Sequence, residues 1–135
     1  MKPKHLVNKK AFQKPQKNTA FPKIWYKAVL KEQADLERMR ISTVQRINKT
    51  LDTLNNKYCW DEAYLFGSVA EKGKFRRHSD IDIAVTGLDK YEYYEFVGEI
   101  SSLLDKRVDV ILLEECHFAD AIRKKGLKWN RKSKL

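Results

Sequence analysis

Two aspartates separated by one residue, Asp80 and Asp82, open the alternating segment 80–86, DIDIAVT. If this segment is a β-strand, both side chains lie on one face, with Cα atoms roughly 6.5–7 Å apart. Two carboxylates that close repel each other, and a shared cation relieves the repulsion. Mg²⁺ suits this position because it prefers oxygen ligands and keeps places for water and phosphates, and a pair of ions can stabilise a phosphoryl-type displacement. The alternative is an acidic strand face exposed to water.

A third acid, Asp109, is the only acid in the otherwise apolar segment 107–113, RVDVILL. An unpaired carboxylate in an apolar strand is costly, so Asp109 needs a cationic partner. One possibility is an ion pair, for which the candidates are Arg107, Arg76 and Arg77. The other is a metal ion, because Asp109 completes a cluster of three carboxylates with Asp80 and Asp82 if the two strands are neighbours.

Gly67 and Ser68 directly follow the short apolar run 63–66, and Asp80 comes twelve residues after Ser68. A glycine after a strand lets backbone N–H groups approach a polyphosphate, and a serine hydroxyl adds a donor. A helix that begins at about Ser68 would add free N–H groups at its N-terminus. Three cations also lie in the segment 74–77, KFRR. The combination predicts a phosphate-binding turn beside the carboxylates.

The segment 65–85, LFGSVAEKGKFRRHSDIDIAV, resembles the nucleotidyltransferase motif of the DNA polymerase β-like superfamily. In that motif a hydrophobic strand ends in Gly-Ser, two aspartates one residue apart follow about a dozen residues later, and a later strand supplies a third carboxylate. In size the chain is similar to the minimal nucleotidyltransferases (MNT), often antitoxins partnered with HEPN-domain toxins. The resemblance covers roughly residues 60–128. Eleven residues separate Ser68 from Asp80, one more than in the commoner pattern.

The resemblance implies a role for each matching residue. The catalytic and metal-binding residues it implies are Asp80, Asp82 and Asp109. Of these, Asp109 would activate the acceptor hydroxyl. The nucleotide-binding residues it implies are Gly67, Ser68 and Ser79. Gly67 and Ser68 would hold the β- and γ-phosphates of a nucleoside triphosphate, and Ser79 would shape the turn before the aspartates.

The function implied is transfer of AMP, or another nucleoside monophosphate, from ATP or the corresponding triphosphate to a hydroxyl, with two Mg²⁺ ions as cofactor. The resemblance points to a tyrosine of a HEPN toxin as the acceptor, which would make the chain an antitoxin. Two alternatives stay open. One is a non-catalytic antitoxin or binding module that blocks a toxin or another small helical protein stoichiometrically. The other keeps the enzyme but transfers the nucleotide to RNA or to an aminoglycoside-like small molecule.

The elements expected to position these residues define an α/β (α+β) fold. We predict strands at 63–66, 80–86 and 107–113 and helices at 91–104 and 117–125, which together make a small mixed sheet flanked by helices. Apolar residues at helical spacing predict a long N-terminal helix from Lys23 to about Lys57, with a break near 41–43. The domain organisation expected is a basic flexible arm (1–22), an N-terminal helical segment (23–58), and a nucleotidyltransferase domain with a basic C-terminal tail (59–135). Trp129 is expected at the end of the last helix, as a packing residue or a partner contact.

The 135 residues suffice for one domain with a hydrophobic core and are too few for two. The net charge of +10 is unevenly distributed: residues 1–31 carry +9, residues 121–135 carry +7, and residues 32–120 carry −6. An acidic domain therefore lies between basic ends, which suits an acidic partner or RNA.

Other classes of protein are disfavoured. No apolar run approaches the roughly 18 residues of a membrane span, and no continuous apolar stretch at the N-terminus marks a secretory signal. Cys59 and Cys116 lie far apart without CxxC spacing, which disfavours a disulfide scaffold or a zinc site and fits a reducing compartment. We therefore expect a cytoplasmic protein without a membrane partner.

Overall fold

The structure is a computed structural model that describes residues 22–130. The predicted basic arm, apart from Pro22, and the last five residues of the predicted tail lie outside the described residues. Among the described residues, 36–130 cluster as one compact unit and 22–35 belong to a separate one. The C-terminal part of the long helix therefore belongs to the same unit as the sheet.

The sheet has four strands in the order β3-β2-β1-β4. Their bounds are Glu62–Phe66 for β1, Ile81–Thr86 for β2, Val108–Leu112 for β3 and Leu127–Trp129 for β4. Strand β1 pairs antiparallel with β2 and with β4, whereas β2 and β3 are parallel. The predicted mixed sheet is confirmed. Strand β4 was not predicted, because three residues are too few for an alternating pattern to show.

Three α-helices accompany the sheet in residues 22–130: α2 (Lys23–Leu54), α3 (Tyr93–Leu104) and α4 (Ala119–Lys125). Three short 3₁₀ turns also lie in the described residues: η1 (Gly67–Ala70), η2 (Lys90–Glu92) and η3 (Leu113–Glu115). The predicted break near 41–43 is wrong, since α2 runs through that segment without interruption. The Thr43 hydroxyl donates a hydrogen bond to the Met39 carbonyl at 2.7 Å, so the hydroxyl has a partner within the helix and does not interrupt it. No helix within residues 22–130 is both long and apolar enough to cross a membrane.

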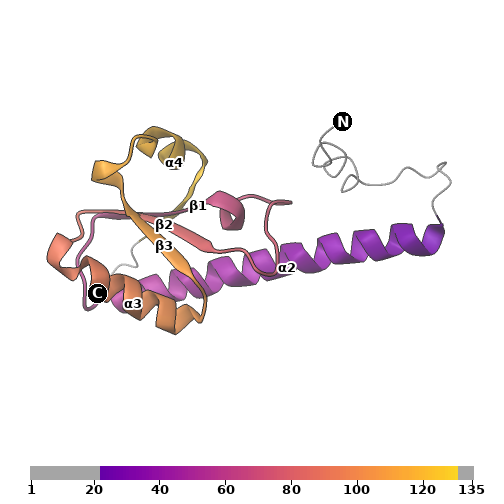
Figure 1. The fold of residues 1–135 in the computed structure, drawn as a ribbon, viewed down its shortest axis with the longest axis horizontal. Helices are drawn as coiled ribbons and strands as arrows, with labels where there is room; N and C mark the ends of the chain where they lie inside the picture. The colour runs from indigo at the N-terminus through magenta and orange to yellow at the C-terminus, as the bar shows by residue number, and fades with distance from the viewer. Residues whose placement is uncertain (1–21, 131–135) are drawn as a thin grey trace, which may run out of the picture. The chain divides into compact units, whose positions relative to one another are not determined.

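Alternation along the strands gives the sheet two different faces. One face packs against α2 and α3 in a large core that includes Ile47, Leu51, Leu65, Ile83 and Phe96, all essentially buried. The opposite face carries a smaller apolar cluster under η3 and α4, which consists of Tyr64, Ala84, Leu113 and Ile122. Figure 1 shows α3 and α4 on opposite sides of the sheet. The larger core supplies most of the hydrophobic stabilisation, and the second face is left partly open.

Strand β4 brings Trp129 into the larger core. The Trp129 side chain is only 4% exposed, and its ring centroid lies 5.2 Å from that of Trp60. Its indole N–H donates to a carboxylate oxygen of Asp52, on α2, at 3.0 Å. The predicted place of Trp129 at a helix end is wrong, and of its two predicted roles the structure supports packing.

We expect Trp129→Ala to destabilise the protein by about 3–5 kcal/mol, because it empties a buried aromatic site and removes the Asp52 hydrogen bond. The measurement is urea unfolding followed by circular dichroism. Leu127→Ala, on the same strand but 37% exposed, is the matched control and should cost about 1 kcal/mol or less. Equal losses in the two variants would contradict a core role for β4.

Candidate functional site

The open face of the sheet aligns three residues in one row. In the strand register, Phe66 of β1 is opposite Asp82 of β2, and Asp82 is opposite Asp109 of β3. Register partners in neighbouring strands point to the same face, so the two carboxylates lie side by side. Asp80 directly precedes β2 at the same end of the sheet. The structure therefore brings the three predicted aspartates to the same end of the open face, where β2 and β3 begin.

Gly67 lies against the Asp82 carboxylate. Its backbone has φ +73°, and a Cβ atom at this position would lie 2.4 Å from the Asp82 Oδ2. Any side chain would both strain the backbone and push the carboxylate away. Ser68 follows, half-buried, in the turn η1. The α-helix considered at Ser68 is replaced by this four-residue 3₁₀ turn, so no extended helix dipole points at the site.

The carboxylates influence one another electrostatically. Burial, followed by the negative charges of Asp109 and Asp80, raises the pKa of the Asp82 carboxyl above its ordinary value. The Nε of Arg107 lies 3.9 Å from the Asp80 Oδ2 and 3.7 Å from the Asp109 Oδ1. Arg107, one of the three arginines that the sequence offered, therefore pairs with Asp109. Because Arg107 is 75% exposed, this pair adds little stability.

Ser79 shapes the turn before the aspartates. Its hydroxyl accepts a hydrogen bond from the Arg76 backbone N–H at 2.8 Å, and its own N–H donates to the Arg76 carbonyl at 3.1 Å. The adjacent Phe75 is buried in the larger core and anchors the loop. These contacts fix the chain direction at Asp80. The predicted part of Ser79 in nucleotide binding stays a prediction.

The donor set of this edge fits a magnesium ion. Among residues 22–130, no set of three or more His, Cys, Asp or Glu side chains is close enough to hold a metal ion by itself. Mg²⁺ rarely needs such a set, because it is usually held by one or two carboxylates while water and substrate phosphates fill its other positions. Asp82 and Asp109 supply two adjacent oxygen-donor groups. Burial, and after it the charges of Asp109 and Asp80, raise the pKa of Asp82, and a cation would offset the charge part of this cost.

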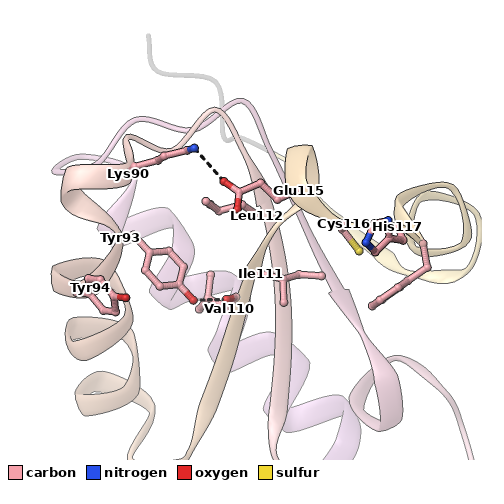
Figure 2. A pocket seen from close by; sticks show the side chains of 10 residues that line it. Lys90, Tyr93, Tyr94, Val110, Ile111, Leu112, Glu115, Cys116 and His117 are labelled. Carbon is pink, nitrogen blue, oxygen red and sulfur yellow. Dashed lines mark hydrogen bonds and ion pairs between the residues drawn. The ribbon is translucent and has the colours of Figure 1, made fainter.

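A pocket of about 610 Å³ lies beside this row and was missed by the sequence analysis. Figure 2 shows its walls: Tyr93 and Tyr94 from the start of α3, Ile111 from β3, and His117 from the connection to α4. Phe118 also lines it. These segments are separated along the chain and no sequence motif links them. The only available sign was the run of tyrosines at 91–94.

Comparison with known proteins identifies the class of protein. Residues 46–131 match the family described as "Polymerase beta, Nucleotidyltransferase", which spans more than half of the chain. The chain belongs to this nucleotidyltransferase family. No curated protein sequence matches it significantly. The resemblance and the fold predicted from the sequence are both confirmed.

Several solved structures that are similar to this chain come from toxin–antitoxin complexes. A chain of a toxin–antitoxin complex with AMP-PNP is 27% identical, with a TM-score of 0.53, over 64% of this chain and 74% of that chain. A chain from the complex of tri-AMPylated HEPN toxin and MNT antitoxin of Shewanella oneidensis is 25% identical, with a TM-score of 0.50, over 67% and 73%. A chain of a mutant MntA–HpeT complex is 24% identical, with a TM-score of 0.52 over 64% and 74%, and is similar in fold.

We expect Gly67→Ala to be more destabilising than Gly73→Ala, by about 1 kcal/mol or more. Both glycines have positive φ, but a Cβ at Gly73 meets nothing within 4 Å, whereas one at Gly67 meets the Asp82 carboxylate. Chemical denaturation of the two variants measures the difference. In the background of Asp82→Ala the excess cost of Gly67→Ala should disappear. An unchanged cost in that background would show that Gly67 and Asp82 are not in contact.

We expect Asp82→Asn to raise Tm at neutral pH by about 2–5 °C. Because the pKa of Asp82 is raised in the folded state, its contribution to stability is complete below the unfolded-state value near 3.8 and is lost as the pH rises through the folded-state pKa. The amide removes this loss. The gain should therefore vanish in acid, where Asp82 is protonated in both states. Calorimetry in metal-free buffer measures the gain. The control is Asp120→Asn, at an exposed position of α4, which should show no gain.

Proposed function

We propose that this nucleotidyltransferase transfers AMP from ATP to a tyrosine hydroxyl of a HEPN-type toxin and acts as its antitoxin. The observation that carries the proposal is the row formed by Asp82 and Asp109 in register, with Gly67 packed against the Asp82 carboxylate. Two adjacent carboxylates beside a backbone that admits no side chain suit a nucleotide whose phosphates approach closely.

The chemistry needs a phosphate cradle and a base. The backbone around Gly67 and the Ser68 hydroxyl would donate hydrogen bonds to the β- and γ-phosphates, and so hold the leaving pyrophosphate over the end of β1. A carboxylate oxygen of Asp109 would take the proton of the acceptor hydroxyl while the hydroxyl oxygen forms its bond to the α-phosphorus. The bond from the α-phosphorus to the bridging oxygen breaks, and pyrophosphate leaves. The Asp109 side chain is 48% exposed, which suits a base that must meet a substrate.

Asp80, Asp82 and Asp109 would hold two Mg²⁺ ions. When bound, these ions supply positive charge that stabilises the triphosphate and the leaving pyrophosphate. Without a cation, Arg107 provides positive charge to Asp80 and Asp109 at 3.9 and 3.7 Å. The exposed guanidinium can swing away at small cost, so it leaves the carboxylates available. Ser79 would support the site by fixing the approach of the chain to Asp80.

The choice of nucleotide and partner is supported by the similar structures. One of them is a toxin–antitoxin complex with AMP-PNP, and another contains a tri-AMPylated HEPN toxin with its MNT antitoxin. The basic segment 121–130 offers charge for contact with an acidic protein surface. Both cysteines of the chain are free, which is consistent with the cytoplasmic location that this role requires.

We expect Asp82→Asn and Asp109→Asn each to reduce transfer by at least about 100-fold, because each loses a metal-binding or proton-accepting carboxylate. The assay incubates the full chain, MgCl₂ and ATP radiolabelled at the α-phosphate with a purified HEPN-type toxin, and measures label on that toxin. Asp120→Asn is the control and should retain full transfer. EDTA should abolish transfer in every variant.

Undiminished labelling by Asp82→Asn would contradict the proposal. Co-expression with the toxin separates it from stoichiometric inhibition. If Asp82→Asn loses transfer and also fails to protect cells, catalysis is the antitoxin activity. If it still protects them, the chain neutralises the toxin by binding.

A further inference from the structure

We propose that the pocket beside Asp109 is the acceptor subsite and that it takes the aryl ring of a tyrosine presented by a protein chain. This inference rests on the proposed function and adds where the acceptor binds and which residues select it. It concerns the pocket residues of Figure 2, none of which belongs to the phosphate cradle or the carboxylate row.

The pocket begins where the carboxylate row ends. Ile111, in its wall, follows Asp109 by two residues on β3, so both side chains lie on the same face of the edge strand, roughly 6.5–7 Å apart. The negative charge of Asp109 also contributes, after burial and Tyr94, to raising the pKa of Tyr93 across the pocket. A hydroxyl at Asp109 would therefore have the rest of its molecule over Ile111 and inside the pocket.

The geometry of displacement favours the acceptor over the nucleotide as the occupant. In phosphoryl-type transfer the attacking and leaving oxygens lie roughly in line on opposite sides of phosphorus. Asp82 lies on β2, the strand between β1 and β3. The strand order places Gly67, which follows β1, on one side of Asp82, and places Asp109, which lies on β3, on the other side. If pyrophosphate leaves over Gly67, the attacking hydroxyl must come from the side of β3. That is the side on which the pocket opens.

The chemistry of the walls suits a neutral aromatic ring. Tyr94 is 84% exposed and Phe118 is 54% exposed, so both rings are available to a ligand. The Tyr93 hydroxyl donates to the Val110 carbonyl at 2.5 Å, and its ring meets that of Tyr94 edge to face at 5.2 Å, so the Tyr93 ring is held in place. A ligand ring that meets these rings edge to face or offset-stacked gains stabilisation beyond the burial of its apolar area.

The charges at the rim disfavour the other acceptors. Lys90 and Glu115 pair with each other at 3.1 Å, as Figure 2 shows. The lining thus has no excess of positive charge for an RNA backbone and no excess of negative charge for a polycationic aminoglycoside. The volume of about 610 Å³ exceeds that of one side chain and leaves room for the neighbouring main chain of a partner.

The test is a titration of the isotope-labelled full chain with N-acetyl-tyrosinamide, in MgCl₂ and AMP-PNP, followed by NMR. We expect shifts of the backbone amides of Ile111, Cys116 and His117, and about 10-fold weaker binding in Phe118→Ala and in Tyr94→Ala. Because Tyr94 is largely exposed, its variant keeps the test informative if Phe118→Ala fails to fold. Tyr91→Ala is the matched control, since Tyr91 is 97% exposed and does not line the pocket.

Three outcomes would overturn the inference. One is that N-acetyl-threoninamide binds as tightly as N-acetyl-tyrosinamide. Another is that shifts occur only around residues 67–70. The third is that Phe118→Ala weakens AMP-PNP binding while N-acetyl-tyrosinamide binds as before, which would make the pocket a nucleobase subsite.

Failure of the proposed function would look different. In that case the wild-type chain binds no AMP-PNP or transfers no label, whatever the pocket binds. If N-acetyl-tyrosinamide still binds at Ile111 and His117 and is lost in Phe118→Ala, the aryl subsite stands without the transfer.

Discussion

The parallel pairing of β2 with β3 places two carboxylates side by side. The rest of the structure must stabilise this pairing against their repulsion. Asp82 and Asp109 are opposite each other in the register, and the Gly67 backbone lies against the Asp82 carboxylate. Partial burial of Asp82, together with the like charges of Asp109 and Asp80, raises the pKa of Asp82 and the free energy of the folded state at neutral pH. The arrangement persists because the strands that carry it are fixed from the other face.

That fixation comes from the larger core. On each strand the residues next to the aspartates point away from the site, so Ile81, Ile83, Val108 and Val110 pack against α2 and α3 while the carboxylates face outward. Hydrophobic burial on one face thus offsets electrostatic repulsion on the other. The same division explains why α4 and η3 cover only part of the second face: the smaller apolar cluster ends at the row where the charged side chains begin.

Local patterns in the sequence predicted much of this accurately. The alternation in 80–86 predicted a strand with its acids on one face, and the apolar runs around Leu65 and Val110 predicted its neighbours. The prediction failed where the local signal was weak or misleading. The residues 41–43 suggested a helix break, but Thr43 bonds back to Met39 within α2. Strand β4 has three residues and carries Lys128, and only pairing with β1 and the burial of Trp129 make it a strand.

The sequence alone determined which residues are able to do chemistry. The type of a residue sets its chemistry, and alternation along a strand sets the face of the sheet to which its side chain points. It left open whether Arg107 pairs with Asp109. Apart from the tyrosines at 91–94, it contained no sign that Ile111, His117 and Phe118 line one pocket with Tyr93. Those relations join residues far apart in the chain. Only the tertiary structure decided them, since strand order, register and the packing of α3 and α4 bring such residues together.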